Sequence, residues 1–412
     1  MTSTTPHFLA KQPVLPIWED RSLASSFFAI NPEFMAFAKM VETGLKGLRQ
    51  KGEPLVILPH IQADPDALCT AFAISELCSL MGVDHWIGVS EPIQGPICRF
   101  LQAERGEDVL DRVRNLENPE ALEAFTRTLG PYVAFQVDAH AGFRLGDRAA
   151  LRDQASSIWI LDHHCIDPED EGELAKIKAQ AGSGVYVQSD RSSCAELAAA
   201  LIYLILEDQG YDPLAVWRER LTLINALLAG IYSDSGSLMY PAADPWTYTC
   251  STFLVGAGAE KELINAKLFK EISYTSFEAR AQAFLKTQIL ADGQIAFMAI
   301  EPEWIASGVL QGPDFAVLVA RMRNIQGVRI GALLKVLSPD WTQFKISLRS
   351  GPQDSILEIA RAFGGGGHRQ AAAASFTLPP MTGPGKALQE IQGRLIKLAQ
   401  PILRAEANQA DV

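Results

Sequence analysis

The sequence predicts an α/β protein: an N-terminal domain with a mainly parallel sheet flanked by helices, followed by a smaller α/β C-terminal domain with a mixed sheet. Three observations predict this class. Before about residue 258, short apolar runs typical of buried strands alternate with helical patterns, which indicates βαβ units. Beyond that point, strand-like segments follow one another more closely. The length of 412 residues is sufficient for two or three domains.

The N-terminal half of the chain gives strand and helix signals in turn. Residues 1–50 are a helical lead-in, and residues 51–258 are assigned to the first domain. The continuous apolar runs typical of buried parallel strands are 54–60, 132–138 and 157–162. The helical patterns are 32–49, 67–81, 193–207 and 214–231. Because ligand sites of parallel sheets lie at the carboxyl ends of strands, the polar residues that end these runs are the first functional candidates.

The C-terminal part is divided into a helical linker at 259–285 and a second domain at 286–412. Its strand-like segments are 294–300, 315–320, 328–336 and 343–348. Its helix-like segments are 355–363 and 386–403. No internal repeat is present, and the only biased tracts are the glycines at 364–367 and the alanines at 371–374.

Composition excludes several classes of protein. With 48% hydrophobic and 20% charged residues, the chain is not disordered or a coiled coil. A net charge of −12 argues against wrapping duplex DNA, whereas a small phosphorylated substrate remains compatible because a local metal or arginine site can offset that charge. No uncharged apolar run reaches the ~18 residues of a membrane span, and no signal peptide is expected. Six cysteines without a CxxC pair fit a reducing cytoplasm. The charged insert around 99–125 is most simply a solvated surface element.

Histidines and aspartates gather where the apolar runs end. His60, Asp64 and Asp66 lie on one strand-to-helix turn, and Asp162 is followed directly by two histidines. Taken alone, Asp64 fits the N-cap of the next helix equally well, and Asp138 and Asp234 are ordinary turn residues. The ordered set is more specific than its parts. It supplies six ligands for two divalent ions, with a carboxylate left to bridge them. Hydrolysis of phosphate esters or anhydrides is the reaction that such a two-metal site serves.

The motifs HIQADPDALCTA, VDAHA, LDHHC and AGIYSDSG occur in that order, and KISLRS and GGGGHRQAAAAS follow them. With these motifs the chain resembles the DHH phosphoesterase superfamily, in the branch that joins a DHH catalytic domain to a DHH-associated C-terminal domain. Enzymes that degrade nanoRNA or dephosphorylate 3′-phosphoadenosine phosphate belong to that branch. The resemblance extends from position 60 to 375, most of the chain.

The resemblance implies a role for each matching residue. One metal ion would be held by His60, Asp64 and Asp138. The second would be held by Asp66, His163 and Asp234, with Asp138 as the bridge. Asp162 would support the site from behind, and His164 would face the substrate phosphate. Ser193 and Glu196 match the start of the helix that precedes the fourth motif.

The C-terminal motifs imply a substrate-binding surface. Glycines let backbone N–H groups approach an anion closely, and arginine offers two parallel donors to a phosphate. Without the resemblance, the glycine run would be interpreted as a flexible linker. The substrate-binding residues that we expect are Arg349, Ser350, Gly366, Gly367, His368 and Arg369.

The resulting hypothesis is a phosphoesterase that uses two Mn²⁺ ions, with Mg²⁺ or Co²⁺ as other candidates. Its substrates would be short single-stranded oligonucleotides, linear dinucleotides or nucleoside 3′,5′-bisphosphates, bound in the cleft between the two domains. A cytoplasmic protein without membrane or duplex-DNA partners is expected, and a homodimer is left open. Three alternatives remain: a cyclic dinucleotide phosphodiesterase, an inorganic pyrophosphatase, and a nucleotide-sensing protein without catalysis.

Overall fold

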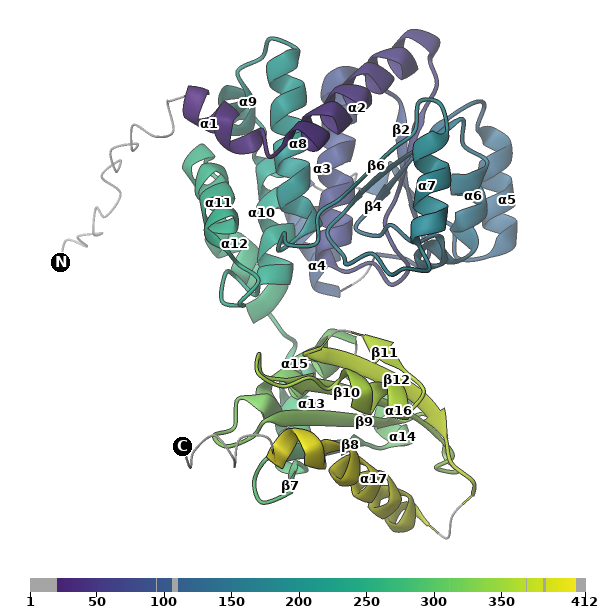
Figure 1. Ribbon diagram of the computed structural model, residues 1–412, viewed down its shortest axis with the longest axis vertical. Helices are drawn as coiled ribbons and strands as arrows, with labels where there is room; N and C mark the ends of the chain where they lie inside the picture. Colours follow the sequence, from purple (N-terminus) through teal and green to yellow (C-terminus); the bar gives the residue numbers. More distant parts are fainter. Residues whose placement is uncertain are drawn as a thin grey trace, which may run out of the picture. The chain divides into compact units, whose positions relative to one another are not determined.

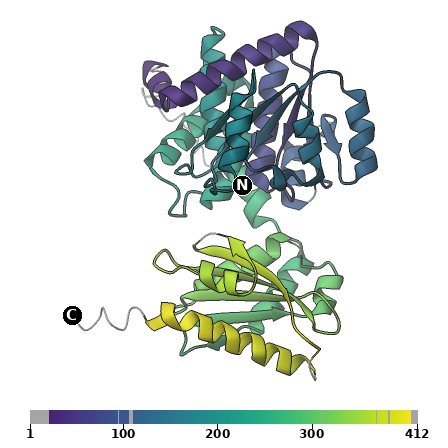
Figure 2. The same cartoon turned by 45° about the vertical axis from the view of Figure 1, so that its right-hand side comes forward.

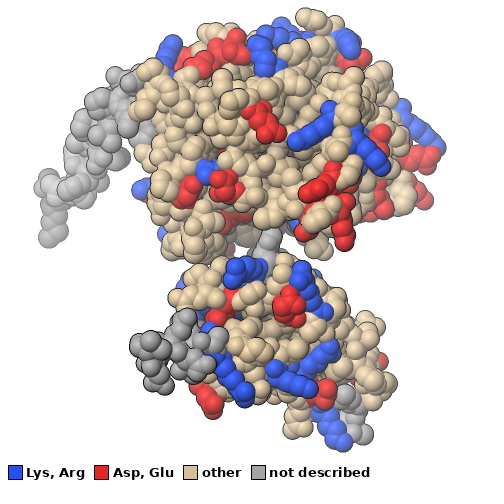
Figure 3. All heavy atoms as spheres, viewed as in Figure 1, with Lys and Arg blue, Asp and Glu red and all other residues tan. Residues whose placement is uncertain are grey.

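The computed structural model describes residues 21–93, 95–105, 110–310, 312–367, 369–380 and 383–404. The chain divides into two units, Met1–Glu271 and Ile272–Val412. The boundary between the units falls inside 259–285, the segment expected to be a helical linker. The bounds expected for the individual domains stay a prediction. Among the described helices, none has both the length and the apolar character needed to cross a bilayer. Acidic and basic side chains are interspersed on the visible surface of both units (Figure 3).

Unit 1 contains a six-stranded sheet in which every pair of neighbours is parallel. The strands stand in the order β3-β2-β1-β4-β5-β6. They are β1 (Leu55–Leu58), β2 (His85–Val89), β3 (Val113–Asn115), β4 (Val133–Val137), β5 (Ser157–Asp162) and β6 (Gly184–Val187). From β1 the chain continues to β2 and β3 on one side of the sheet, and from β4 it continues to β5 and β6 on the other side. The β1/β4 boundary is therefore the topological switch point, where ligand sites of open parallel sheets form.

Alternate residues of the central strands enter two different cores. Ile57, Phe135 and Leu161 point into the larger core, whereas Val56, Ala134 and Ile160 point into the smaller one. Helices cover both faces (Figures 1 and 2). The larger core is closed by α2 (Pro32–Lys51), α3 (Pro65–Met81), α4 (Gly95–Arg105) and α8 (Cys194–Asp208). The smaller is closed by α5 (Pro119–Thr128), η3 (Gly142–Arg148), α6 (Ala149–Asp153) and α7 (Glu171–Ala179). Burial on both faces explains why β1 reads as a continuous apolar run.

The remaining helices of unit 1 pack around α8, α3 and α10, except that the last of them contacts α4. They are α1 (Arg21–Phe28), α9 (Pro213–Glu219), α10 (Leu221–Ser235), α11 (Pro245–Ala257), α12 (Lys261–Asn265) and η4 (Ala266–Lys270). Helix α10 lies closest to its neighbours at Gly230, where an added Cβ would be 2.5 Å from the Cβ of Ala195 and 2.7 Å from Oδ1 of Asp66. The absence of a side chain there lets α10 approach both α8 and α3.

Unit 2 contains a mixed sheet in the order β11-β12-β10-β9-β8-β7. Its β8 and β9 are parallel and its other pairs antiparallel. The strands are β7 (Gln288–Leu290), β8 (Ile295–Ile300), β9 (Ile330–Val336), β10 (Gln343–Ser350), β11 (Gly366–Gly367) and β12 (Ala371–Thr377). One face packs against α16 (Leu357–Ala362) and α17 (Pro384–Arg404), and the other against α13 (Tyr274–Leu285), α14 (Pro302–Ala306) and α15 (Gly312–Arg323). The expected α/β class, with a parallel and a mixed sheet, is confirmed.

One expected strand is wrong. Residues 315–320 lie inside helix α15. The segment is rich in β-branched and aromatic residues, but Phe315, Leu318, Val319 and Met322 recur at helical spacing and pack together in one core. Gly312 and a proline start this helix, and Asp314 lies in its first turn. Six strands were not expected at all: β2, β3, β6, β7, β11 and β12.

Candidate metal centre

The candidate ligands gather at the carboxyl ends of three adjacent strands. His60 follows β1, Asp138 follows β4 directly, and Asp162 ends β5. Two further carboxylates come from helices: Asp66 from the first turn of α3, and Asp234 from the last turn of α10. The potential ligand atoms form three groups, and the atoms within each group lie within 4.8 Å of one another. The groups are His60–Asp64–Asp138, Asp66–His163–Asp234 and Asp138–His163–His164.

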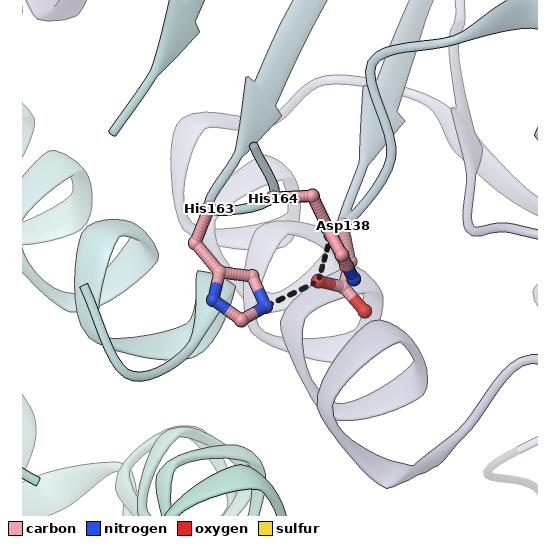
Figure 4. Close-up of side chains that lie close together, drawn as sticks. All are labelled: Asp138, His163 and His164. Atoms are coloured by element: carbon pink, nitrogen blue, oxygen red, sulfur yellow. Dashed lines mark ion pairs between the residues drawn. The ribbon is translucent and has the colours of Figure 1, made fainter. Parts of the chain in front are cut away.

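Asp138 lies at the middle of this arrangement (Figure 4). Its backbone has a φ of 57°, which is unfavourable for a non-glycine residue, and its N–H donates to the carbonyl of Leu161. Its carboxylate is 1% exposed and lies between two rings: Oδ2 is 3.4 Å from Nε2 of His60, and Oδ1 is 3.2 Å from Nε2 of His163. The strained backbone therefore directs one buried carboxylate at two imidazoles.

Neither contact has the geometry of a hydrogen bond. Both carboxylate oxygens of Asp138 and Nε2 of His60 and of His163 are buried without a hydrogen-bond partner among the described residues. Leaving such groups unpaired costs free energy, so a folded protein usually supplies a partner. Two carboxylate oxygens and two imidazole nitrogens that face one another suit divalent transition-metal ions. The residues present thus fit a metal centre.

The first group combines a strand end with a helix start. Nδ1 of His60 lies 2.7 Å from the carbonyl oxygen of Ile61. Because a carbonyl only accepts, Nδ1 carries the proton and the neutral ring offers Nε2 as a ligand. Asp64 has two roles: Oδ1 caps α3 by accepting from the N–H of Ala67, and Oδ2 lies 3.8 Å from Nε2 of His60. Both interpretations of Asp64, helix cap and ligand, fit this geometry.

The second group is built in the same way. Nδ1 of His163 donates to the carbonyl of Arg191 at 3.1 Å, which leaves Nε2 facing Asp234 Oδ2 at 3.4 Å and Asp66 Oδ2 at 3.9 Å. The Asp66 carboxylate also accepts from the backbone N–H groups of Cys194 and Ala195 at the N-terminus of α8. Helix α8 therefore fixes the orientation of Asp66, and the loop before it fixes that of His163.

The charges of these groups are strongly perturbed. Burial lowers the pKa of His60, but the Asp138 and Asp64 carboxylates outweigh it and raise that pKa to about 10. Burial raises the pKa of Asp234 to about 6, although His163 opposes this. Burial, together with repulsion from Asp138 and Asp234, also raises the pKa of Asp66. Without cations the centre therefore retains protons that bound metal ions would displace.

Asp162 belongs neither to the His60–Asp64–Asp138 group nor to the Asp66–His163–Asp234 group, and it orients other side chains. Its Oδ1 accepts from the backbone N–H groups of His163 and His164 and from Nδ1 of His164 at 2.8 Å. Its Oδ2 lies 2.5 Å from Nδ1 of His140, whose Nε2 is 3.4 Å from Asp170. Burial opposes ionisation, but His140 and His164 hold the pKa of Asp162 well below its usual range. Nδ1 of His164 is thus bound by Asp162, which fixes the orientation of the ring.

The expected substrate-binding residues lie together at one end of the unit 2 sheet. Arg349 pairs across the sheet with Ala371, and Ser350 N–H donates to the carbonyl of Gln370. The carbonyl of Arg369 accepts from Ile356. Gly366 and Gly367 form β11, which pairs with β12, and both are exposed. His368 lies outside the described residues.

Two of the four glycines at 364–367 lie where the structure has no room for a side chain. An added Cβ on Gly365 would lie 2.0 Å from the carbonyl oxygen of Ala373, and one on Gly367 would lie 2.6 Å from that of Ala371. The glycine run and the alanine run are therefore complementary, because small residues on both sides let the backbones meet. Gly366 has open space around it. The glycine run is thus an edge strand rather than a free linker.

Sequence reasoning missed the parts of the site that orient the ligands. The carbonyl of Arg191 that binds His163 is a backbone group and carries no residue signature. Its loop is held by Glu196, which accepts from the N–H and the hydroxyl of Ser192. Asp170 was not singled out either, because an acidic residue in an acidic loop looks ordinary. Gly230 lay inside a quoted motif but was given no role.

No family model matches the chain. It is 24% identical over 355 residues to the bifunctional oligoribonuclease and PAP phosphatase NrnA of Thermus thermophilus, which covers 84% of this chain and 90% of that protein. It is 25% identical over 346 residues to the cyclic-di-AMP phosphodiesterase GdpP of Geobacillus thermodenitrificans, covering 82% and 47%. It is also 25% identical over 279 residues to the A-adding tRNA nucleotidyltransferase of Geobacter sulfurreducens, covering 67% and 28%.

The chain thus spans less than half the length of two of these relatives. Among solved structures, an exopolyphosphatase-related protein from Bacteroides fragilis has the same fold, with a TM-score of 0.70 at 16% identity over 90% of this chain and 98% of that one. Two of the sequence relatives align with more than four fifths of the chain. These similarities support the resemblance of the chain to the DHH phosphoesterase superfamily.

Proposed function

We propose that this protein is a two-metal phosphoesterase that hydrolyses short oligonucleotides, linear dinucleotides or nucleoside 3′,5′-bisphosphates. The single observation that carries the proposal is the set of four buried polar atoms around Asp138 that face one another without hydrogen bonds. The substrate class is supported by the oligoribonuclease and PAP phosphatase that aligns with most of the chain.

In this proposal His60, Asp64 and Asp138 would hold one Mn²⁺ ion, and Asp66, His163 and Asp234 would hold the other. Asp138 would contribute to both, because its Oδ2 faces His60 and its Oδ1 faces His163. Bound divalent ions supply charge that lowers the pKa of water and stabilises the entering and leaving oxygens of an in-line displacement. The carbonyls of Ile61 and Arg191 keep both imidazoles in the tautomer that such a site needs.

His164 acts on the substrate rather than on the ions. Asp162 accepts from its Nδ1, which orients the ring toward the place that the substrate phosphate would occupy. His140 holds the other oxygen of Asp162, so that the carboxylate cannot rotate away. In unit 2, Arg349, Ser350, Gly366, Gly367, His368 and Arg369 are proposed to bind the rest of the nucleotide.

The test is a substrate panel with Mn²⁺: a 5′-phosphorylated dinucleotide, phosphoadenosine phosphate, cyclic di-AMP and pyrophosphate. We expect release of mononucleotide or phosphate from the first two and a loss of about 10³-fold in Asp138→Asn. Asp147→Asn is the matched control, because Asp147 is exposed on the segment that follows Asp138. Turnover confined to cyclic di-AMP or pyrophosphate would move the assignment to those substrates. Nucleotide binding without any turnover would make the protein a sensor and overturn the proposal.

A further inference from the structure

The sheet of unit 2 is covered unequally on its two faces. On one face α16 and α17 pack over a continuous core that reaches β12. On the other face α13, α14 and α15 pack mainly over β8 and β9, with α15 extending to β10 (Figures 1 and 2). The core on this second face contains no residue of β10, β11 or β12. The side chains that these strands direct to that face are accordingly only partly buried or exposed.

The uncovered part of this face is basic. Alternation along the strands places Lys335 of β9 and Lys345 and Arg349 of β10 on the same face as Leu333, which belongs to the α13–α15 core. Strands β9, β10, β11 and β12 contain these three cations and not one aspartate or glutamate. In a chain with a net charge of −12, that is a local reversal of sign. We call Lys335, Lys345, Ser347 and Arg349 the basic sheet face.

Two of its cations oppose each other. Lys345 pairs directly with Lys335 across the antiparallel β10–β9 ladder, an arrangement that destabilises a sheet when nothing lies between the charges. Within the part of the chain that the structure describes, neither ammonium group has a carboxylate within 4.0 Å, and Lys335 lies 4.6 Å above the ring of Phe315. Burial and the neighbouring Lys345 lower the pKa of Lys335. An anion between the two would remove this repulsion.

The face is also long and open. From Lys345 to Arg349 the strand advances about 13 Å, which is longer than a single phosphate group. The β12 residues beside this stretch are Ala371, Ala373 and Ser375, so no large side chain stands next to the cations on that side. Small apolar residues between spaced cations suit a chain of sugars linked by phosphates better than a compact anion.

We propose that the basic sheet face binds the phosphodiester backbone of a single-stranded oligonucleotide at phosphates other than the one that is cleaved, with Lys335 and Lys345 as the pair that holds the distal phosphate. The proposal deepens the proposed function and rests on it for the chemistry of cleavage. It assigns to these two lysines additional affinity for oligonucleotides that are longer than a dinucleotide.

The test measures binding without turnover. In an Asp138→Asn background, the Kd of a 5′-phosphorylated five-residue oligoribonucleotide and of a dinucleotide is measured by fluorescence anisotropy. Lys335→Gln/Lys345→Gln should weaken the five-residue probe about tenfold and the dinucleotide less than about twofold. It should also reduce the slope of log Kd against log salt by about 0.7, the value for one lost phosphate of a single strand. Lys386→Gln/Lys397→Gln is the matched control, since both lysines are exposed on α17, over the opposite face.

Equal Kd values for the five-residue probe in the two double variants would overturn the proposal. So would competition by tripolyphosphate at the same concentration as by the oligonucleotide, because the face would then recognise charge alone. Absence of hydrolysis by the unmodified protein would contradict the proposed function, but it would leave the binding result readable. The two failures are therefore distinguishable.

Discussion

Asp138 combines a left-handed backbone with a carboxylate that is almost completely removed from solvent. Each feature costs free energy, and both persist only where something compensates. The compensation that its surroundings offer is electrostatic: His60 and His163 lie on either side, and Asp66 and Asp234 stand close enough for their charges to interact with it. At the scale of single residues, the centre is a cluster of charges that only cations can balance fully.

The first prediction concerns protons. Metal-free His60 has a pKa of about 10, because the carboxylates outweigh burial, so its ring is protonated at pH 7.5; the pKa of His163 is raised for the same reason. An imidazole ligand must be neutral, so Mn²⁺ binding should release at least one proton per chain, and affinity should fall as the pH falls. Titration calorimetry in buffers of different ionisation enthalpy measures the number. An observed enthalpy that does not change with the buffer would contradict this description.

The second prediction separates two buried aspartates. Asp162 orients His164 and faces neither main group, whereas Asp66 lies in the Asp66–His163–Asp234 group. Asp162→Asn should reduce kcat ten- to a hundredfold with two Mn²⁺ per chain retained. Asp66→Asn should lose about one ion as well as activity. Metal analysis of both variants at saturating Mn²⁺ decides, and loss of an ion in Asp162→Asn would show that Asp162 has been assigned the wrong role.

At the scale of elements, the strands that carry the site were the easiest to predict. The runs that became β1, β4 and β5 are buried on both faces, so they are mostly apolar and end abruptly at His60, Asp138 and Asp162. Residues 315–320 were harder, because a short apolar segment satisfies strand and helix patterns alike and tertiary packing decides. Strand β12 could not be predicted, since alanine disfavours strands and its reason is the backbone of Gly365 and Gly367 beside it.

The same contrast holds within the site. Ligand side chains carry a signature of residue type and spacing, and the structure brings all six expected ligands together. The groups that orient the ligands carry no such signature, because they belong to the backbone. The carbonyl of Arg191 binds His163, and N–H groups of α8, more than a hundred residues away in the chain, bind Asp66. Such contacts depend on how distant elements meet, which no local pattern encodes.

The third prediction concerns one such meeting. Gly230→Ala adds a Cβ that would lie 2.5 Å from Ala195 and 2.7 Å from Asp66, so α10 must move or Asp66 must turn. We expect a loss of about 1–3 kcal/mol in the free energy of unfolding together with weaker Mn²⁺ binding. Gly47→Ala in α2 is the control, because no atom lies within 4 Å of its added Cβ. That control should gain up to about 1 kcal/mol, measured by denaturant unfolding. Equal changes in both variants would show that α10 is not packed as described.

At the scale of the whole molecule, the chain has two units with separate hydrophobic cores, and all six expected metal ligands belong to unit 1. Units with their own cores can unfold independently. Because a ligand stabilises only the folded region that binds it, the metal should act on one unit and leave the other unchanged.

The fourth prediction follows from this separation. Differential scanning calorimetry should resolve two transitions, and Mn²⁺ at about 100 times its Kd should stabilise one of them by about 2.7 kcal/mol per site. For a unit of this size that corresponds to a rise in Tm of about 5–10 °C for a single site. Asp138→Asn should abolish the shift while leaving the other transition in place, since the Asp138 carboxylate lies against both His60 and His163. A common shift of both transitions would mean that the units unfold as one cooperative body, and it would refute the assignment of the metal centre's stabilising effect to unit 1 alone.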